Sequence, residues 1–316
     1  MSVQPESMQA EDKFLLLQDN DLFRATHSLQ PTTPYHVDIT LKTDLPGLSD
    51  LACAVFVDIF TSIRRLALRL QQELGIFRFG LVSAGDKVVS LIPLHGLQPG
   101  SEWKPIMAKE SVFCGKTFPG YINSRNGQKM DDKELDSIRD ALRAVSGLQE
   151  DRIGKTLIGK HDETNLFARL IKEEIPCWKY YDTSSHVAFL TPFPNTTGYS
   201  CVIPKSYFSS DILAMPEEPY RQLLSAGWEV AQLFKQAFHV KKVGFMMEGY
   251  EINHAHLKVV PIWQGGEEES VRQAVWFEQY SGYLTTQKGR RLSDGHERKQ
   301  LEILSASLRS KLAAAE

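Results

Sequence analysis

The feature that most constrains the fold of this chain is an internal repeat. Four residues of the segment 32–39, "TTPYHVDI", recur 164 positions later in the segment 196–203, "TTGYSCVI". The same offset relates Gly80 to Gly244. An offset that stays constant through several elements is not expected of chance matches, so the sequence predicts a duplicated domain.

The repeat continues through a helix and a tail. Two helical patterns of matching length carry apolar residues at the i, i+4, i+8 spacing of a buried helix face. These residues are Leu66, Leu70 and Leu74 in the first copy and Val230, Phe234 and Phe238 in the second. Farther on, "FPGYINSRNGQKMDD" from Phe118 matches "YSGYLTTQKGRRLSD" from Tyr280, and a charged amphipathic helix follows each. The predicted repeats span residues 14–150 and 160–316, the second opening with the lead-in "NLFARLIKEEIPCW".

Each repeat has the pattern of two strands, a long helix, two more strands, an irregular tail and a helix. Strands and helices are segregated along the chain, which indicates an α+β fold with antiparallel sheets and not a βαβ array. In the second repeat the helix is expected after Pro216, with two glutamates in its first turn. The strands expected there lie within residues 186–193, 199–205, 242–248 and 252–263.

Composition narrows the class of protein. The 316 residues carry a formal net charge of −3, which gives no bulk electrostatic reason to expect a nucleic acid or a membrane as partner. The polar, acidic start lacks the pattern of a secretory signal, and the apolar run "LACAVFVDIF" is too short to span a bilayer. Four scattered cysteines without a C-x-x-C pair are typical of reduced thiols. We therefore expect a cytoplasmic protein, with a nuclear location left open.

Polar residues alternate in the segment 253–261, "NHAHLKVVP". Side chains of a strand alternate between faces, so His254, His256 and Lys258 are expected to share one face while the residues between them point into the core. Such a face suits a phosphate chain, because lysine neutralises phosphate oxygens and histidine attacks phosphorus or moves protons. Alternatives are a metal pair, for which no third ligand is evident, and histidines that are structural or vestigial. Neither a metal nor a cofactor is expected.

The motif "HAHLKVVP" resembles the signature of the histidine-triad (HIT) superfamily, H-φ-H-φ-H-φ-φ. Residues 165–262 resemble the rest of that domain, with an "EIP" segment, a strand pair turning through Pro and Gly, and then "VIPK". The resemblance implies two HIT-like domains, each an antiparallel sheet with a long helix. The domain at 14–150 lacks the histidine motif, and the one at 160–316 carries it and a C-terminal tail helix. They are expected to pair as an intramolecular pseudo-dimer, with further association left open.

The resemblance also implies a chemistry. In HIT enzymes the middle histidine attacks the α-phosphate of a nucleotide, and water or another acceptor resolves the nucleotidyl-histidine. This role falls on His256, with His254 orienting it. The expected function is that of a nucleotide hydrolase or nucleotidyl transferase acting on a dinucleoside polyphosphate or phosphoramidate, with a small-molecule nucleotide as partner. The alternative is a catalytically impaired nucleotide-binding or scaffold protein.

The expected nucleotide- and phosphate-binding positions are Lys258, Asn253, Thr191 and Tyr199, and several depart from the family's pattern. Lys258 occupies the third motif position. Thr191 stands where the family usually has a ribose-binding aspartate, and Tyr199 where it usually has histidine. The loop before the motif is the short "EGYEIN", and its acid Glu251 is expected to hinder phosphate binding unless it is protonated or paired with Lys258.

At the constant offset of 164, the three motif positions fall on Ser90, Ile92 and Leu94, so the first repeat has no nucleophile. His95 is one position out of register. The first repeat is therefore expected to be a structural partner, or to lend residues to the live site from its "GYINSRNG" tail. The tail segments "GYINSRNG" and "GYLTTQKG" are interpreted as turns, with phosphate binding through backbone N–H groups as the alternative.

Overall fold

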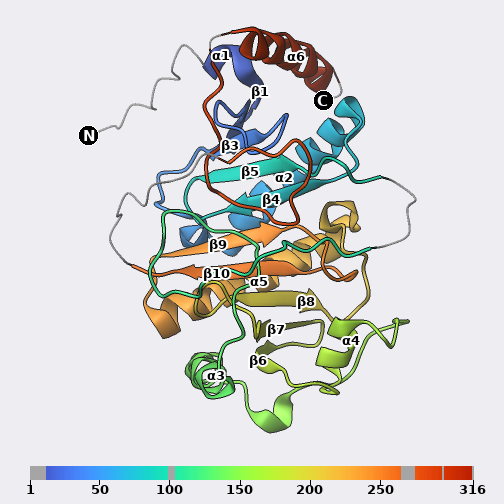
Figure 1. The fold of residues 1–316 in the computed structure, drawn as a ribbon. Helices are drawn as coiled ribbons and strands as arrows, with labels where there is room; N and C mark the ends of the chain where they lie inside the picture. The colour runs from blue at the N-terminus through green and yellow to red at the C-terminus, as the bar shows by residue number, and fades with distance from the viewer. Residues whose placement is uncertain (1–11, 99–103, 265–274, 294, 315–316) are drawn as a thin grey trace.

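The computed structural model describes residues 12–98, 104–264, 275–293 and 295–314, and these form one ten-stranded antiparallel sheet (Figure 1). The strand order is β1-β2-β3-β5-β4-β9-β10-β8-β7-β6. The first five strands are β1 (Leu16–Asp19), β2 (Phe23–His27), β3 (Val37–Leu41), β4 (Phe79–Ser83) and β5 (Val88–Pro93). The others are β6 (Trp178–Asp182), β7 (His186–Leu190), β8 (Ser200–Pro204), β9 (Lys242–Met247) and β10 (Leu257–Ile262).

A pseudo-two-fold axis passes through the middle of this sheet. β4 pairs with β9 in antiparallel fashion, with Val82 opposite Met246, and these two residues are 164 positions apart. Outward from this pair, the order β4, β5, β3, β2, β1 on one side matches β9, β10, β8, β7, β6 on the other. Such a self-complementary contact is the arrangement of a two-fold dimer. The predicted α+β fold, with two similar units paired within one chain, is confirmed.

Two long helices cover one face of the sheet (Figure 1). α2 (Cys53–Leu74) and α5 (Glu217–Phe238) have 22 residues each and pack against one another. They end at Gly75 and His239, both in the left-handed conformation that commonly terminates a helix. The predicted apolar stripes lie in one continuous core with the sheet, so the helical periodicity is confirmed.

The tail of each repeat crosses to the other repeat. After β5, the first tail (residues 104–131) runs to α3 (Asp132–Ser146), which packs on β6 and α5 of the second repeat. The Gly127 N–H donates to the Phe193 carbonyl at 2.8 Å. A Cβ at Gly127 would lie 1.9 Å from the Pro194 carbonyl oxygen, so only glycine permits this approach.

The second tail makes the matching contact with the first repeat. It runs through residues 275–293 to α6 (His296–Ala313), which packs on β1. Gly289 N–H donates to the Gln30 carbonyl, and a Cβ there would lie 1.8 Å from the Pro31 carbonyl oxygen. The two tails also pair with each other, Asn123 opposite Thr285, across the face of the sheet that the long helices leave free (Figure 1). The "GYINSRNG" and "GYLTTQKG" segments therefore contact each other and the opposite repeat.

The remaining helices are short: α1 (Asp12–Leu15), α4 (Leu166–Ile171) and the 3₁₀ turns Leu48–Asp50, Glu150–Arg152 and Ile212–Ala214. Within the residues that the structure describes, no helix combines the length and apolarity needed to cross a bilayer. The boundaries 14–150 and 160–316 remain a prediction. By its contacts, each repeat is completed by the tail of the other.

Candidate active site around His256

The histidine motif lies at the start of β10, and only its lysine is within the strand. The strand begins at Leu257, whereas the sequence placed its start at residue 252. Residues 251–254 bend instead, because His254 N–H donates to the Ile252 carbonyl and Ala255 N–H donates to the Phe208 carbonyl. The predicted alternation of faces persists through this segment. Ala255, Leu257 and Val259 belong to the core beneath the long helices, and the three motif side chains lie on the opposite face.

The imidazole of His256 is held in one tautomer. Its Nδ1 lies 2.8 Å from the backbone carbonyl oxygen of His254. A carbonyl oxygen only accepts, so Nδ1 carries the hydrogen and Nε2 keeps its lone pair. Nε2 makes no hydrogen bond to any described residue. Burial lowers the pKa of His256 to about 3, and the nearby Lys258 contributes, so the ring is neutral at pH 7. The arrangement provides a fixed, unprotonated nitrogen.

His254 orients His256 through its backbone, while its own ring is anchored elsewhere. The His254 Nε2 lies 2.9 Å from the Pro204 carbonyl oxygen, and the residue is fully buried. Burial lowers its pKa to about 4, against the effect of the Pro204 carbonyl. The ring of His161 stacks on it at 6.0 Å between centroids. The predicted orienting role of His254 is thus compatible with this geometry, through the carbonyl rather than the imidazole.

Lys258 is enclosed by carboxylates. Its Nζ lies 3.2 Å from Glu248 and 3.7 Å from Glu251. Burial would lower the pKa of Lys258, but Tyr199, Glu248 and Glu251 outweigh it and hold the pKa well above its usual value. The pairing of Glu251 with Lys258 that the sequence left open is therefore present. Sequence reasoning missed the second carboxylate, although Glu248 stands only three residues before Glu251.

The Glu248 carboxylate also joins the two tails to the site. It accepts a hydrogen bond from the Tyr280 hydroxyl of the second tail, and Ser124 of the first tail is a further partner. Burial raises the pKa of Glu248, and Lys258 and Tyr280 oppose that shift. The first repeat thus does lend a residue, Ser124, to the surroundings of the histidine motif.

The other predicted binding residues are spread over the second repeat. Tyr199 lies beside Lys258, and its buried hydroxyl has no hydrogen-bond partner among the described residues. Asn253 fixes the loop, since its Oδ1 accepts from Ser210 N–H at 3.2 Å. Thr191 lies beyond the end of β7, level with Tyr199. By the strand register this is four residues, roughly 14 Å, from the level of His256, so the structure does not bring these two together.

α4 covers the histidine pair. The Phe167 ring lies 5.2 Å from the ring of His256 and 5.8 Å from that of His254, edge to face. Phe167 packs in an apolar cluster with side chains of β7 and β8. Only 2% of the surface of His256 is exposed. The lead-in segment, which the sequence analysis placed at the opening of the second repeat, therefore covers His256.

The strand register corrects the alignment of the motif with the first repeat. Ser90 lies opposite Val82 as Lys258 lies opposite Met246, so Ser90 corresponds to Lys258 and Val88 to His256. The sequence had matched Ser90 to His254, four positions away, because the paired residues Val82 and Ser90 are 8 positions apart along the chain whereas Met246 and Lys258 are 12 apart. The conclusion that the first repeat lacks the motif histidines is unchanged. His95 contacts the Pro34 carbonyl instead.

No model of a protein family matches the chain. An uncharacterized HIT-like protein of Methanocaldococcus jannaschii is 23% identical over 107 residues, covering 33% of this chain and 82% of that protein. The adenosine 5′-monophosphoramidase of Saccharomyces cerevisiae is 27% identical over 101 residues, covering 32% of this chain and 63% of that protein.

Among solved structures, an ADP-glucose phosphorylase from Arabidopsis thaliana with bound ADP-glucose has a TM-score of 0.45 and 11% identity. The match covers 79% of this chain and 74% of that one. Within the described part of this chain, no group of three or more His, Cys, Asp or Glu residues is placed to hold a metal ion.

Proposed function

We propose that this chain, which is a tandem HIT-like protein, transfers the nucleotidyl group of a nucleoside phosphate through attack of His256 on the α-phosphorus. The Nε2 lone pair attacks phosphorus, and the bond to the leaving group breaks with its electron pair going to that group. Water or another acceptor then attacks the nucleotidyl-histidine, and the N–P electron pair returns to Nε2. The products are a nucleoside monophosphate or its transfer product and a protonated leaving group.

The observation that carries this proposal is the contact between His256 Nδ1 and the His254 carbonyl. A buried histidine with one nitrogen donating to a carbonyl leaves the other nitrogen as a nucleophile at neutral pH. The carbonyl also stabilises the positive ring that forms once Nε2 is bonded to phosphorus.

Binding a phosphate requires positive charge, and this is the requirement that the described site meets least directly. Lys258 is the cation nearest to the motif, and two carboxylates offset its charge. Glu251 is the farther and the more exposed of the two, with 16% of its side chain accessible. We infer that a bound phosphate displaces Glu251 from Lys258, while Glu248 remains in place.

Mass spectrometry of the protein quenched in alkaline denaturant, in which the P–N bond of a nucleotidyl-histidine survives, tests the proposal. The protein is incubated with adenosine 5′-phosphoramidate, chosen because one relative is a monophosphoramidase, and with a dinucleoside polyphosphate. We expect an adenylyl adduct on His256 and turnover, both abolished in His256→Ala. His296→Ala, on the exposed face of α6, is the control and should retain both. Turnover that persists in folded His256→Ala would exclude this histidine as the nucleophile.

A second function is favoured by the enclosure of Lys258 and by the cover of α4. A nucleotide-binding or scaffold protein that has lost the chemistry would also have these features. In the same experiment it would bind nucleotides, giving a shift in the melting temperature, and it would form neither an adduct nor a product with any of the substrates.

A further inference from the structure

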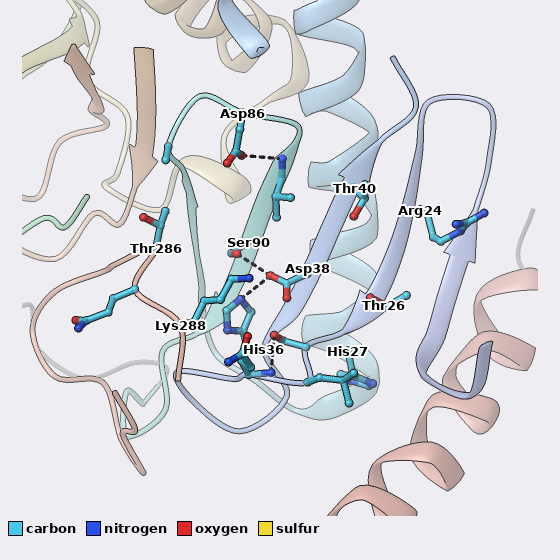
Figure 2. A pocket seen from close by; sticks show the side chains of 16 residues that line it. Arg24, Thr26, His27, His36, Asp38, Thr40, Asp86, Ser90, Thr286 and Lys288 are labelled. Atoms are coloured by element: carbon cyan, nitrogen blue, oxygen red, sulfur yellow. Dashed lines mark hydrogen bonds and ion pairs between the residues drawn. The ribbon is translucent and has the colours of Figure 1, made fainter. Parts of the chain in front are cut away.

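The first repeat contains an open polar cavity of about 760 Å³. It is lined by β2, β3 and β5 and closed on one side by the second tail, as Figure 2 shows. This volume falls in the range of small-molecule sites. The cavity lies on the sheet face opposite the long helices, the same face that carries His256 in the second repeat.

The residues on this face are apolar and covered in the second repeat, and polar and open in the first. By the strand register, Thr26 corresponds to Phe189, Asp38 to Cys201 and Val88 to His256. In the second repeat, Phe189 and Cys201 pack in the apolar cluster under α4. In the first, the corresponding threonine and aspartate line an open cavity. The repeat without the motif histidines therefore has a polar lining on this face, which a purely structural partner does not need.

Asp38 is the centre of this lining. Its Oδ1 accepts a hydrogen bond from Ser90 Oγ at 2.8 Å and lies 3.2 Å from His36 Nε2. The Thr32 N–H donates to His36 Nδ1, which leaves Nε2 on the side of the ring that faces the carboxylate. Burial would raise the pKa of Asp38, but His36, Ser28 and Ser90 together outweigh it and hold the pKa far below the usual range. A fixed, ionised carboxylate at the floor of a cavity accepts hydrogen bonds from ligand hydroxyls.

Hydroxyl and amide groups surround this carboxylate. The lining includes Thr26, Ser28, Gln30, Thr40, Thr286 and Gln287. Among the described residues it contains no Phe, Tyr or Trp, so a nucleobase would find only two imidazoles on which to stack. Val88 gives an apolar patch that suits the C–H face of a sugar ring.

One cation at the rim is available for an anionic group. Lys288, supplied by the second tail, is exposed, and no carboxylate of the described residues lies within ion-pair distance of it. Figure 2 shows its side chain reaching over the cavity toward Asp38. Arg24, the other basic residue in the lining, is already paired with Asp19 at 3.4 Å.

We propose that this cavity binds a small polyhydroxylated anion of the sugar-phosphate type. Asp38 and the threonine hydroxyls would accept and donate hydrogen bonds to the sugar, and Lys288 would bind the phosphate. The site is separate from His256 and does not rest on the function proposed there. The proposal assigns a ligand to the first repeat, which lacks the motif histidines.

Isothermal titration of the full chain tests this assignment with glucose 1-phosphate, glucose 6-phosphate, ribose 5-phosphate, glucose and inorganic phosphate as probes. We expect at least one sugar phosphate to bind more tightly than glucose or phosphate alone. Lys288→Met should weaken that binding about tenfold or more, as expected for a lost charge-assisted contact. Lys241→Met, an exposed lysine outside the cavity, is the matched control and should bind as the native chain does.

Two further variants separate this site from the other. Val88→Phe places a larger side chain in the cavity without removing a charge and should weaken binding, while the chain keeps its melting temperature within a few degrees. His256→Ala should leave sugar-phosphate binding unchanged. Any one of three results would overturn the proposal. They are equal affinity for inorganic phosphate and sugar phosphates, loss of binding in His256→Ala, and no binding of any sugar phosphate at 10 mM, on the order of the weakest useful affinity.

Discussion

The buried contact between Lys258 and Glu248 makes a quantitative prediction about stability. The two charges lie 3.2 Å apart with almost no solvent exposure. At an effective dielectric constant of 20, their attraction is about 5 kcal/mol, and it offsets the cost of removing both from water. We expect Lys258→Met to lower the free energy of unfolding by about 3–5 kcal/mol, because it leaves Glu248 as an uncompensated buried charge. Glu248→Gln should cost less than Lys258→Met, because Glu251 still lies 3.7 Å from Lys258.

The double variant should recover part of this loss. With both charges gone, the unpaired charge is gone as well, so the combined effect should fall short of the sum by about 1–3 kcal/mol. Urea unfolding at pH 7 measures all four proteins. Glu251→Gln serves as the comparison. It should cost less than Glu248→Gln, since Glu251 lies 3.7 Å from the lysine and is partly exposed. Additive losses in the double variant would refute the view that Lys258 is held by Glu248.

The pH dependence of the Lys258→Met variant provides an independent check. Without the lysine, burial raises the folded-state pKa of Glu248 above its unfolded value of about 4.3. A raised folded pKa means that stability is fully present below pH 4.3 and is lost as the pH rises through the folded pKa. The variant should therefore lose more stability relative to the native chain at pH 8 than at pH 5. Equal losses at both values would indicate that Glu248 keeps another cation.

Three further predictions concern the core and the site. Gly227→Ala should destabilise the chain by about 1–3 kcal/mol in urea unfolding, because its Cβ would lie 2.2 Å from the Leu257 side chain. Phe167→Ala should expose His256 to diethyl pyrocarbonate, which in the native chain should modify exposed His296 much faster; an unchanged rate at His256 would show that α4 is not its cover. Burial lowers the folded-state pKa of four histidines below the unfolded value. Their contribution to the free energy of unfolding should therefore be complete above pH 6.5 and decrease towards pH 4, by about 1.4 kcal/mol per pH unit per group. A flat profile would contradict this. The four histidines are His27, His186 and His254, with pKa values of about 4, and His256, with a value of about 3.

The sequence was sufficient to predict the repeated fold, because its evidence is local and periodic. The spacing of Leu66 and Leu70, matched by Val230 and Phe234, predicts two equivalent helices, and both are found. The crossing of the tails was not predictable in this way. A tail that packs on its own repeat and one that packs on the other have the same sequence pattern. The repeated glycines Gly127 and Gly289 indicate that the backbone is approached closely there, but the sequence does not show which turn approaches it.

The site was predicted in part for a related reason. Alternation along one strand places His254, His256 and Lys258 on one face, and this is found. The partner of Lys258 was missed because Glu248 follows the end of the neighbouring strand β9, and only the register of β9 with β10 brings the two together. The same register shows Val88 and not Ile92 as the counterpart of His256. Loop length decides this register, and a constant offset cannot detect a loop that differs by four residues.

Duplication within one chain allows the two halves of this sheet face, one in each repeat, to differ. In a dimer of identical chains, both copies of the face would have the same residues, so a filled apolar face and an open polar one could not coexist. Here the tails cross, and each face is completed from the other half of the chain: Ser124 reaches the Glu248 cluster, and Lys288 reaches the cavity beside Asp38. A change in either tail therefore acts on the face of the opposite repeat. For that reason Lys288→Met, although it lies in the C-terminal segment that follows the histidine motif, should alter binding at the N-terminal cavity and leave His256 chemistry intact.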